Sequence, residues 1–497
     1  MPIPRSIRRT SAIAVAASAL VAAPAAALNF IDFGMERESA LQGQADDLFG
    51  GVGEPLSASA ATVPNAAGAA SLELAGGLEV SEVLSGDTSG DQEGKLAQNA
   101  DMIAFYPTDS RPQWAIVCVE NNTGNPGVQR VRLRGRNRGE VETILSGTRS
   151  CDGIRRTPWN TIIATEERED GWALEIYDPL ETTGVKFDRA TGVLTGEDAN
   201  NVKTRPALGR FAWEGLQVFE DGTVIAGDEL GPKNRANGGA LFKFVSDRKP
   251  SGPASTGFLS NPANHASSPF AQGKLYTLEV GDGENRGQGN ERGKGRWIGP
   301  IDPAKARAEG QAKGTGFYRP EDLHADPIAL SKGDVRVCWT NTGNVGIANY
   351  GEVLCLDDRP DAAAANTGMT PEVQRFLEGN PYMNQPDNLA FQPETGILYV
   401  IEDSPTVNGQ DKPGDIWACL RDGADRDLQS DGCSLIASVK TQGSEPTGFT
   451  FDASGRRAYL NIQHSPDDPT TPSLDESTFD EMLVIDGFRP RRATATR

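Results

Sequence analysis

The sequence predicts an all-β fold, and within this class a six-bladed β-propeller. Two observations lead to this prediction. From about Met102 onward, short apolar runs rich in β-branched and aromatic residues alternate with turn signals such as Asp221-Gly222. A degenerate unit also recurs, and each copy holds a carboxylate, a short strand, a turn, a second strand and a polar end. Helical patterns are weak and confined to short pieces such as Pro371–Leu377.

The first 27 residues are predicted to be a signal peptide, which is excluded from the fold. Arg8 and Arg9 precede an alanine-rich apolar run at 12–23, and small residues at 25–27 form a cleavage site. The arginine pair favours the twin-arginine route, which exports folded proteins, and an ordinary secretory signal is the alternative. We therefore expect a periplasmic or secreted protein with no stable membrane span.

The rest of the chain divides by composition into two parts. Residues 28–100 form a low-complexity leading segment that is rich in Ala, Gly and Ser from residue 45 onward, with short strand-like pieces such as Leu72–Leu74. Residues 101–497 carry the alternating strand and turn pattern. We expect this second part to be the propeller domain.

Charge and histidine content exclude several classes of function. The formal net charge is −21, from 69 Asp and Glu against 48 Lys and Arg, so the surface repels nucleic acid. Three histidines are too few for a zinc site built on several His ligands, and no HExxH, P-loop or GxSxG motif is present. Any metal would be bound mostly through oxygen, which favours calcium, magnesium or ferric iron.

The recurring carboxylates gain a common position from the propeller prediction. The innermost strand of each blade lines the channel, so residues at equivalent points in each blade converge at its mouth. Such crowded like charges raise each other's pKa unless cations neutralise them, so we expect a central metal-binding channel. The alternative is that each carboxylate caps its own turn. The equivalent residues are Glu214, Glu321, Asp387 and Glu445, and the wide gap after the first predicts a further unit around Leu275–Ile298.

Six cysteines in an exported chain permit disulfides. Cys419 and Cys433 bracket a short polar loop, and Cys338 and Cys355 lie on two strands of a predicted hairpin. We expect both pairs to be bridged. Cys118 and Cys151 are left, and either they pair or Cys151 is free for chemistry.

The stretch CDGIRRTPWNTIIATEE at 151–167 joins a cysteine, two arginines and two adjacent carboxylates. Glu166 and Glu167 end a predicted strand on opposite faces, so only one of them can face a given ligand. Arg319 lies directly before Pro320 and Glu321, where its guanidinium could clamp an oxyanion such as phosphate. This position makes Arg319 a better candidate for an anion clamp than the arginines of the 151–167 stretch.

Together these residues resemble the PhoX-type alkaline phosphatases. The resemblance extends over about 114–464 and rests on a set of motifs in order: CDGIRRTPWNTIIATEE, GRFAWEG, YRPEDL, QPDNLAF and SEPTGFTF. It implies a six-bladed propeller that hydrolyses phosphate monoesters at a cluster of iron and calcium ions, with a cysteine as an iron ligand. Small phosphorylated molecules would be the substrates, and a monomer suffices.

The resemblance implies roles for individual residues. Cys151 would bind iron together with Glu214, and Arg319 would bind the phosphate. The other carboxylates would serve the same cluster of Fe3+ and Ca2+ ions, mainly as calcium ligands. They are Glu166 or Glu167, Glu321, Asp387 and Glu445. The chain departs from the family pattern in having Asn160 for glycine, Trp213 for histidine or serine, and ATEE in place of a CEE version.

Two other functions fit a propeller with a carboxylate-lined channel. One is a lactonase or phosphotriesterase with a single central calcium, which the presence of Cys151 disfavours. The other is a non-catalytic, calcium-stabilised interaction module, which Arg319 disfavours.

Overall fold

The computed structural model describes most of the chain in segments. They are 30–31, 49–63, 68–84, 95–233, 237–249, 262–281, 291–358, 370–403, 406–407, 410–422, 427–441, 444–464 and 480–490. The predicted signal peptide lies outside the described residues. Within them, no helix has both the length and the apolar character needed to cross a membrane.

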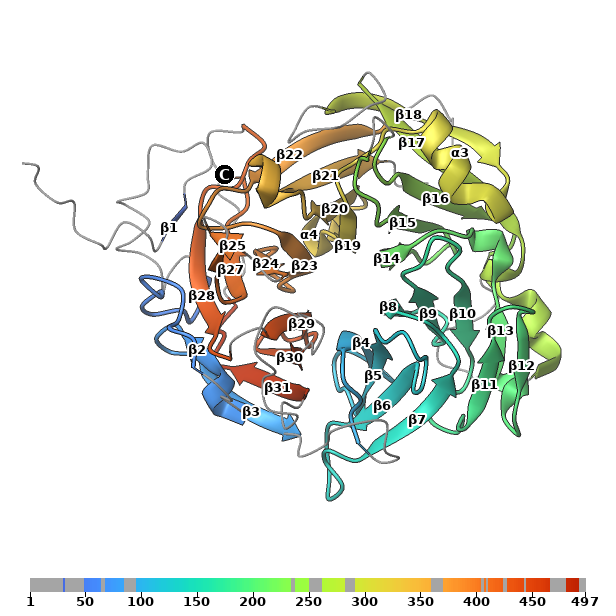
Figure 1. Ribbon diagram of the computed structural model, residues 1–497, viewed down its shortest axis with the longest axis horizontal. Coiled ribbons are helices and arrows are strands. Elements are labelled where there is room, and N and C mark those ends of the chain that lie inside the picture. Colours follow the sequence, from blue (N-terminus) through green and yellow to red (C-terminus); the bar gives the residue numbers. More distant parts are fainter. Residues whose placement is uncertain are drawn as a thin grey trace, which may run out of the picture.

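The described strands form a ring of blades around a common centre, as the sequence predicts (Figure 1). Within the described residues the ring has six blades, each of which begins with a strand beside the centre. These inner strands are β4 (Ala100–Tyr106), β8 (Cys151–Arg156), β14 (Trp213–Val218), β19 (Pro320–Ala325), β23 (Pro386–Phe391) and β29 (Ser444–Phe451).

The first three blades continue outward from their inner strands by antiparallel pairing, apart from one parallel pair at the outer edge of blade one. Blade one adds β5 (Trp114–Val119), β6 (Val128–Arg132) and β7 (Val141–Ser146), and β11 (Val185–Asp188) and β12 (Val193–Thr195) extend its edge. Blade two adds β9 (Ile162–Glu166), β10 (Ala173–Ile176) and β13 (Val202–Thr204). Blade three adds β15 (Val224–Asp228), β16 (Leu241–Ser246), β17 (Gly273–Val280) and β18 (Gly293–Ile301).

Blades four and five follow the same plan. Blade four adds β20 (Val335–Asn341), β21 (Glu352–Asp358) and β22 (Glu372–Glu378), and β22 pairs with β18 of blade three. Blade five adds β24 (Leu398–Glu402), β27 (Asp415–Cys419) and β28 (Cys433–Val439), and a small hairpin is formed by β25 (Thr406–Val407) and β26 (Gln410–Asp411).

The sixth blade is completed by a strand from the beginning of the chain. Its own strands are β29, β30 (Arg457–His464) and β31 (Glu481–Asp486), and β3 (Glu79–Leu84) pairs with β31 as the outermost strand. Likewise β1 (Phe30–Ile31) and β2 (Leu72–Leu74) pair with β28 of blade five. Part of the predicted leading segment is therefore built into the propeller, which does not begin at residue 101.

Two local expectations were wrong. The region around Leu275–Ile298 is not a separate unit, since it forms the outer strands β17 and β18 of blade three. The stretch 371–377, which looked helical, is mostly strand β22, because its pairing with β21 outweighs its local helix propensity. The described α-helices are short connections: α3 (Ala306–Lys313) and α4 (Pro327–Ser331).

Apolar side chains fill the space between neighbouring blades, and two disulfides reinforce blades four and five. Cys338 pairs with Cys355 across β20 and β21, and Cys419 pairs with Cys433 across β27 and β28. Both predicted bridges are confirmed. Their presence fits an oxidising compartment.

Candidate metal centre

An acidic residue occupies the same place in every one of the six inner strands. It is the second residue of each strand, so all six lie at one end of the channel. Four are buried with at most 5% of their surface exposed, and the last two are half-buried: Asp101, Asp152, Glu214, Glu321, Asp387 and Glu445. Glu214, Glu321, Asp387 and Glu445 were predicted from the repeat, whereas Asp101 and Asp152 were missed.

A β-bulge lies at this acidic residue in five of the six described blades. The register between inner and second strand shifts just after Ala100, Cys151, Trp213, Pro320 and Pro386. A bulge leaves one residue unpaired and redirects its side chain. The repeated bulge therefore explains how five carboxylates leave the regular alternation of the strand and turn together toward the channel mouth.

A second tier of side chains comes from the residue that follows each second strand. It is acidic in four of the described blades and a threonine in blade four: Glu120, Glu167, Glu229, Asp403 and Thr342. The sequence carries a signal for this tier, because an apolar strand runs directly into an acid in VCVE, IATEE, VIAGDE and LYVIED. Of these acids, only Glu167 was named from the sequence.

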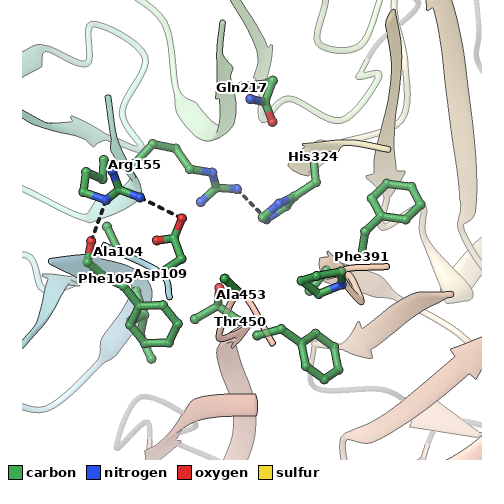
Figure 2. Close-up of a pocket in the computed structure, with 14 residues that line it drawn as sticks. Ala104, Phe105, Asp109, Arg155, Gln217, His324, Phe391, Thr450 and Ala453 are labelled. Carbon is green, nitrogen blue, oxygen red and sulfur yellow. Dashed lines mark hydrogen bonds and ion pairs between the residues drawn. The ribbon is translucent and has the colours of Figure 1, made fainter. Parts of the chain in front are cut away.

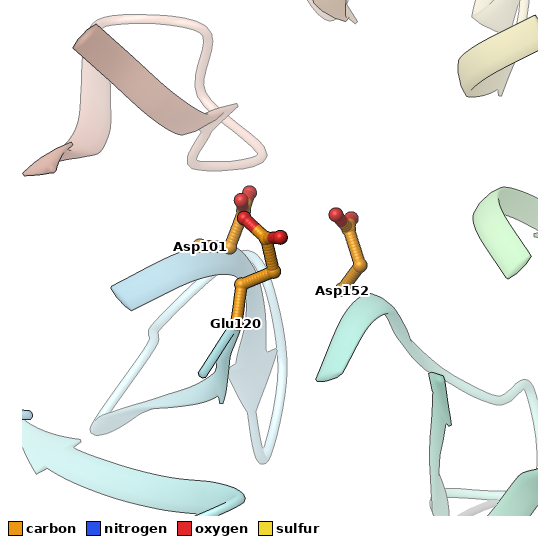
Figure 3. A group of neighbouring side chains, drawn as sticks. All are labelled: Asp101, Glu120 and Asp152. Carbon is orange, nitrogen blue, oxygen red and sulfur yellow. The ribbon is translucent and has the colours of Figure 1, made fainter. Parts of the chain in front are cut away.

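Three groups of carboxylates from both tiers could each hold a metal ion, since their oxygen atoms lie within 4.8 Å of one another. They are Asp101, Glu120 and Asp152; Asp152, Glu167 and Glu214; and Glu214, Glu321 and Asp387. Figure 3 shows the first group, with Asp101 and Glu120 side by side on one blade and Asp152 facing them from the next. Because Asp152 and Glu214 are each shared by two groups, the three form one continuous cluster, here called the carboxylate cluster.

Two buried atoms in the carboxylate cluster have no hydrogen-bond partner among the described residues. They are the Oδ1 atoms of Asp101 and Asp152, whose residues are 5% exposed. The other oxygen of Asp101 accepts a hydrogen bond from Gln463 Nε2 at 2.6 Å. Buried carboxylate oxygens ordinarily have a partner, and hard cations such as calcium bind six to eight oxygens. The residues therefore fit oxygen-bound cations.

The protonation of the carboxylate cluster follows from burial and crowding. Burial, and then the charge of Asp101, raises the pKa of Glu120 to about 8. Burial raises the pKa of Asp152 well above its usual range, and the nearby charges of Asp101 and Glu120 add to this effect. Without cations these side chains hold protons that ordinary carboxylates lose, so cation binding must displace them.

Cys151 is not available as a metal ligand. Its sulfur forms a disulfide with Cys118, and the pair packs in an apolar cluster with Ile154 and Val128. The next residue, Asp152, is the one that reaches the carboxylate cluster. A bridged sulfur is not a thiolate, and only the thiolate binds metal strongly, so the predicted iron ligand is corrected to a structural cysteine.

Glu166 and Glu167 point in opposite directions, as the strand pattern requires. Glu167 belongs to the carboxylate cluster. Glu166 is fully buried, accepts hydrogen bonds from the backbone N–H groups of Arg149 and Trp172 at 2.9 and 3.0 Å, and pairs with Arg189 at 3.0 Å. Its oxygens are used by these groups, so Glu166 is not a metal ligand.

Arg319 lies beside the carboxylate cluster. Its guanidinium pairs with Glu229 at 2.5 Å and with Glu321 at 3.2 Å, and 34% of the side chain is exposed. The residue has a φ of 58°, a conformation uncommon for arginine, and its backbone N–H bonds to Leu230 O. Arg319 therefore presents a partly exposed cation next to buried acids.

The other end of the channel holds a separate cavity of about 330 Å³, with Arg155, Arg156, Gln217 and His324 among its lining residues (Figure 2). Arg155 pairs with Asp322 at 2.8 Å and contacts His324 Nε2 at 2.7 Å. The arginines of the 151–167 stretch therefore lie away from the carboxylate cluster.

A family model described as alkaline phosphatase PhoX matches residues 118–466. The chain belongs to the PhoX family of alkaline phosphatases. None of the curated proteins matches the sequence.

One solved structure supports a PhoX-type fold for this chain. The chain is similar to Pseudomonas fluorescens PhoX in complex with vanadate, a transition state analogue, at 17% identity and a TM-score of 0.56, with 86% of this chain and 98% of that chain covered. It has weaker likenesses to a pyrroloquinoline quinone-bound aldose sugar dehydrogenase from Streptomyces coelicolor (11% identity, 82% and 98% covered, TM-score 0.42) and to regucalcin from Agrobacterium tumefaciens (13%, 81% and 96%, 0.39). These two likenesses carry no conclusion about activity.

Two departures from the PhoX pattern have local explanations. Asn160 adopts a φ of 67° and donates from Nδ2 to Tyr106 Oη at 2.9 Å. Asparagine tolerates this left-handed conformation better than most residues, so it can replace a glycine here. Trp213 is 1% exposed and stacks on Phe211 with ring centroids 4.0 Å apart, which places it in the core rather than over the carboxylate cluster.

Proposed function

We propose that this PhoX-family phosphatase is an exported, calcium-dependent phosphomonoesterase that binds its ester at the acidic end of the channel. The observation that supports this most is the position of Arg319 beside buried carboxylates from several blades. A cation held next to an acidic, metal-binding cluster suits a dianionic phosphoryl group, which needs positive charge from both sides.

In this proposal the carboxylates bind the cations and Arg319 binds the phosphoryl group. The cations would be held by the residues of the carboxylate cluster: Asp101, Glu120, Asp152, Glu167, Glu214, Glu321 and Asp387. Glu445, at the equivalent place in blade six, would be a further ligand. Arg319 would orient the phosphoryl group through its equatorial oxygens. Bound cations would polarise the phosphoryl group and lower the pKa of water. Glu229 now pairs with Arg319 and would fix the guanidinium plane when phosphate arrives. Thr342 donates its hydroxyl hydrogen to Glu321 and holds that carboxylate in place.

The proposal also includes export from the cytoplasm and small phosphate monoesters as substrates. The predicted signal peptide and the three disulfides support export to the periplasm or beyond. Small phosphate monoesters are the proposed substrates, and a monomer would suffice because each blade closes within one chain. Iron, which the sequence resemblance implies, would here have to be bound without Cys151.

Chelation tests this proposal directly. The purified mature chain should hydrolyse p-nitrophenyl phosphate, lose that activity in EGTA and regain it when calcium is returned. The same preparation should leave a lactone and a phosphotriester intact. Full activity in EGTA, or hydrolysis of the lactone instead of the monoester, would contradict the proposal.

A further inference from the structure

We infer that the metal centre of this protein has only oxygen ligands and works with calcium-class divalent cations, without a sulfur-bound iron. The inference rests on the proposed function, because it names the cation class of the same site. It departs from the cysteine-bound iron that the sequence resemblance implies.

No cysteine of the chain has a free sulfur. All six are described, and they form three disulfides. Two of these disulfides are remote from the carboxylate cluster: Cys338–Cys355 joins two strands within blade four, and Cys419–Cys433 joins two strands within blade five. Only Cys118–Cys151 is near the cluster in sequence, and its sulfurs lie in the apolar interior, while the neighbouring Asp152 turns to the channel mouth.

The strand β9 also lacks sulfur beside the carboxylate cluster. Where the family pattern has versions with CEE, this chain has Thr165, Glu166 and Glu167. Thr165 is fully buried, and its hydroxyl donates a hydrogen bond to Gly153 O at 2.8 Å. A neutral hydroxyl binds metal ions much more weakly than a thiolate does. At Thr165, where CEE versions have a cysteine, this chain therefore offers no sulfur ligand.

The carboxylate oxygens of the carboxylate cluster suit hard divalent cations. The three carboxylate groups overlap, because Asp152 belongs to the first and second groups and Glu214 to the second and third. Each of these two carboxylates would therefore serve two ions. The Oδ1 atoms of Asp101 and Asp152 are buried without a hydrogen-bond partner among the described residues, and they belong to the same groups. Carboxylate sets of this kind favour calcium, magnesium and manganese over metals that prefer sulfur.

The test measures the metal content of the purified protein and does not depend on a phosphatase assay. The protein is produced with both calcium and iron in the medium, and its metals are counted by mass spectrometry. Calcium is expected, and iron should fall far short of one ion per chain. Visible absorption from a thiolate–iron bond should be absent, and a thiol assay of the denatured, unreduced chain should find no free sulfhydryl.

Two neighbouring positions supply matched variants. Asp152→Asn should weaken calcium binding by roughly tenfold or more, measured by calorimetry on chelator-stripped protein. It should still fold, since asparagine has nearly the same size and shape as aspartate. The double variant Cys118→Ala with Cys151→Ala should bind calcium as the parent does, while its melting temperature falls because a loop spanning 33 residues is no longer closed.

The outcomes separate this inference from the proposed function. Stoichiometric iron with a thiolate band, or loss of metal in the double cysteine variant, would overturn the oxygen-only centre even if the phosphatase is active. Calcium bound as expected in a protein without monoesterase activity would overturn the proposed function and leave the oxygen-only centre standing.

Discussion

Arg155 and Asp322 form an ion pair across the channel, with 2.8 Å between Nη2 and Oδ1. The two residues belong to the inner strands of blades two and four. The other oxygen of Asp322 accepts a hydrogen bond from the backbone N–H of Leu389 in blade five at 3.2 Å. One carboxylate therefore ties three blades together, one residue further into the channel than Glu321.

We expect Arg155→Met to destabilise the fold by about 3 kcal/mol, because it leaves the Asp322 carboxylate buried without its cation. Only 5% of the Asp322 side chain and 15% of the Arg155 side chain are exposed. Adding Asp322→Asn should restore part of the loss, as measured by urea unfolding. Arg156→Met is the matched control: its partner Asp109 is 51% exposed, so the cost should stay under about 1 kcal/mol. Equal losses in the two arginine variants would refute the bridging role.

Glu166 and Glu167 should respond oppositely to the same substitution. Glu167→Gln is expected to lower calcium affinity by roughly tenfold, because Glu167 belongs to the carboxylate cluster. Glu166→Gln should keep the affinity and lower the melting temperature, since it weakens the ion pair with Arg189. Calorimetric titration with calcium and thermal unfolding measure the two effects. A loss of affinity in Glu166→Gln would show that the strand faces are assigned wrongly.

Calcium-free protein should become less stable as the pH rises. Burial and the charge of Asp101 raise the pKa of Glu120 from 4.5 to about 8, so between these values the folded state binds more protons than the unfolded chain. The free energy of unfolding must then fall with increasing pH across this window. Melting temperatures in EGTA should decline from about pH 5 to about pH 8, and saturating calcium should abolish the decline. A rising or flat profile in EGTA would contradict the pKa shift.

Arg319→Met should lower kcat/KM for a phosphate monoester by a factor of about 100 or more, since a charge that stabilises the transferring phosphoryl group is lost. The carboxylates remain, so the calcium content should be unchanged. Arg319→Lys should recover only part of the loss, because an ammonium group cannot form the same paired contacts. Steady-state kinetics with metal analysis of the same samples test this. Unchanged kinetics with normal metal content would remove Arg319 from the site.

The sequence allowed the fold and half of the acidic site to be predicted. Glu214, Glu321, Asp387 and Glu445 were recognisable because their blades share a regular pattern. Asp101 and Asp152 were missed because blades one and two diverge from that pattern, and the bulges that redirect these side chains depend on strand pairing. The state of Cys151 was equally out of reach, since it depends on whether Cys118 of blade one lies next to it in the folded propeller.

The pairing of β3 with β31 has a consequence for how the protein is made. Residues 79–84 leave the ribosome early, yet their partner at 481–486 is almost the last part of the ring to appear. Until then β3 has an unpaired edge, and the sixth blade cannot close. Ring closure is thus postponed until synthesis is nearly over, and a transport system that accepts only finished, folded cargo would reject every incomplete chain.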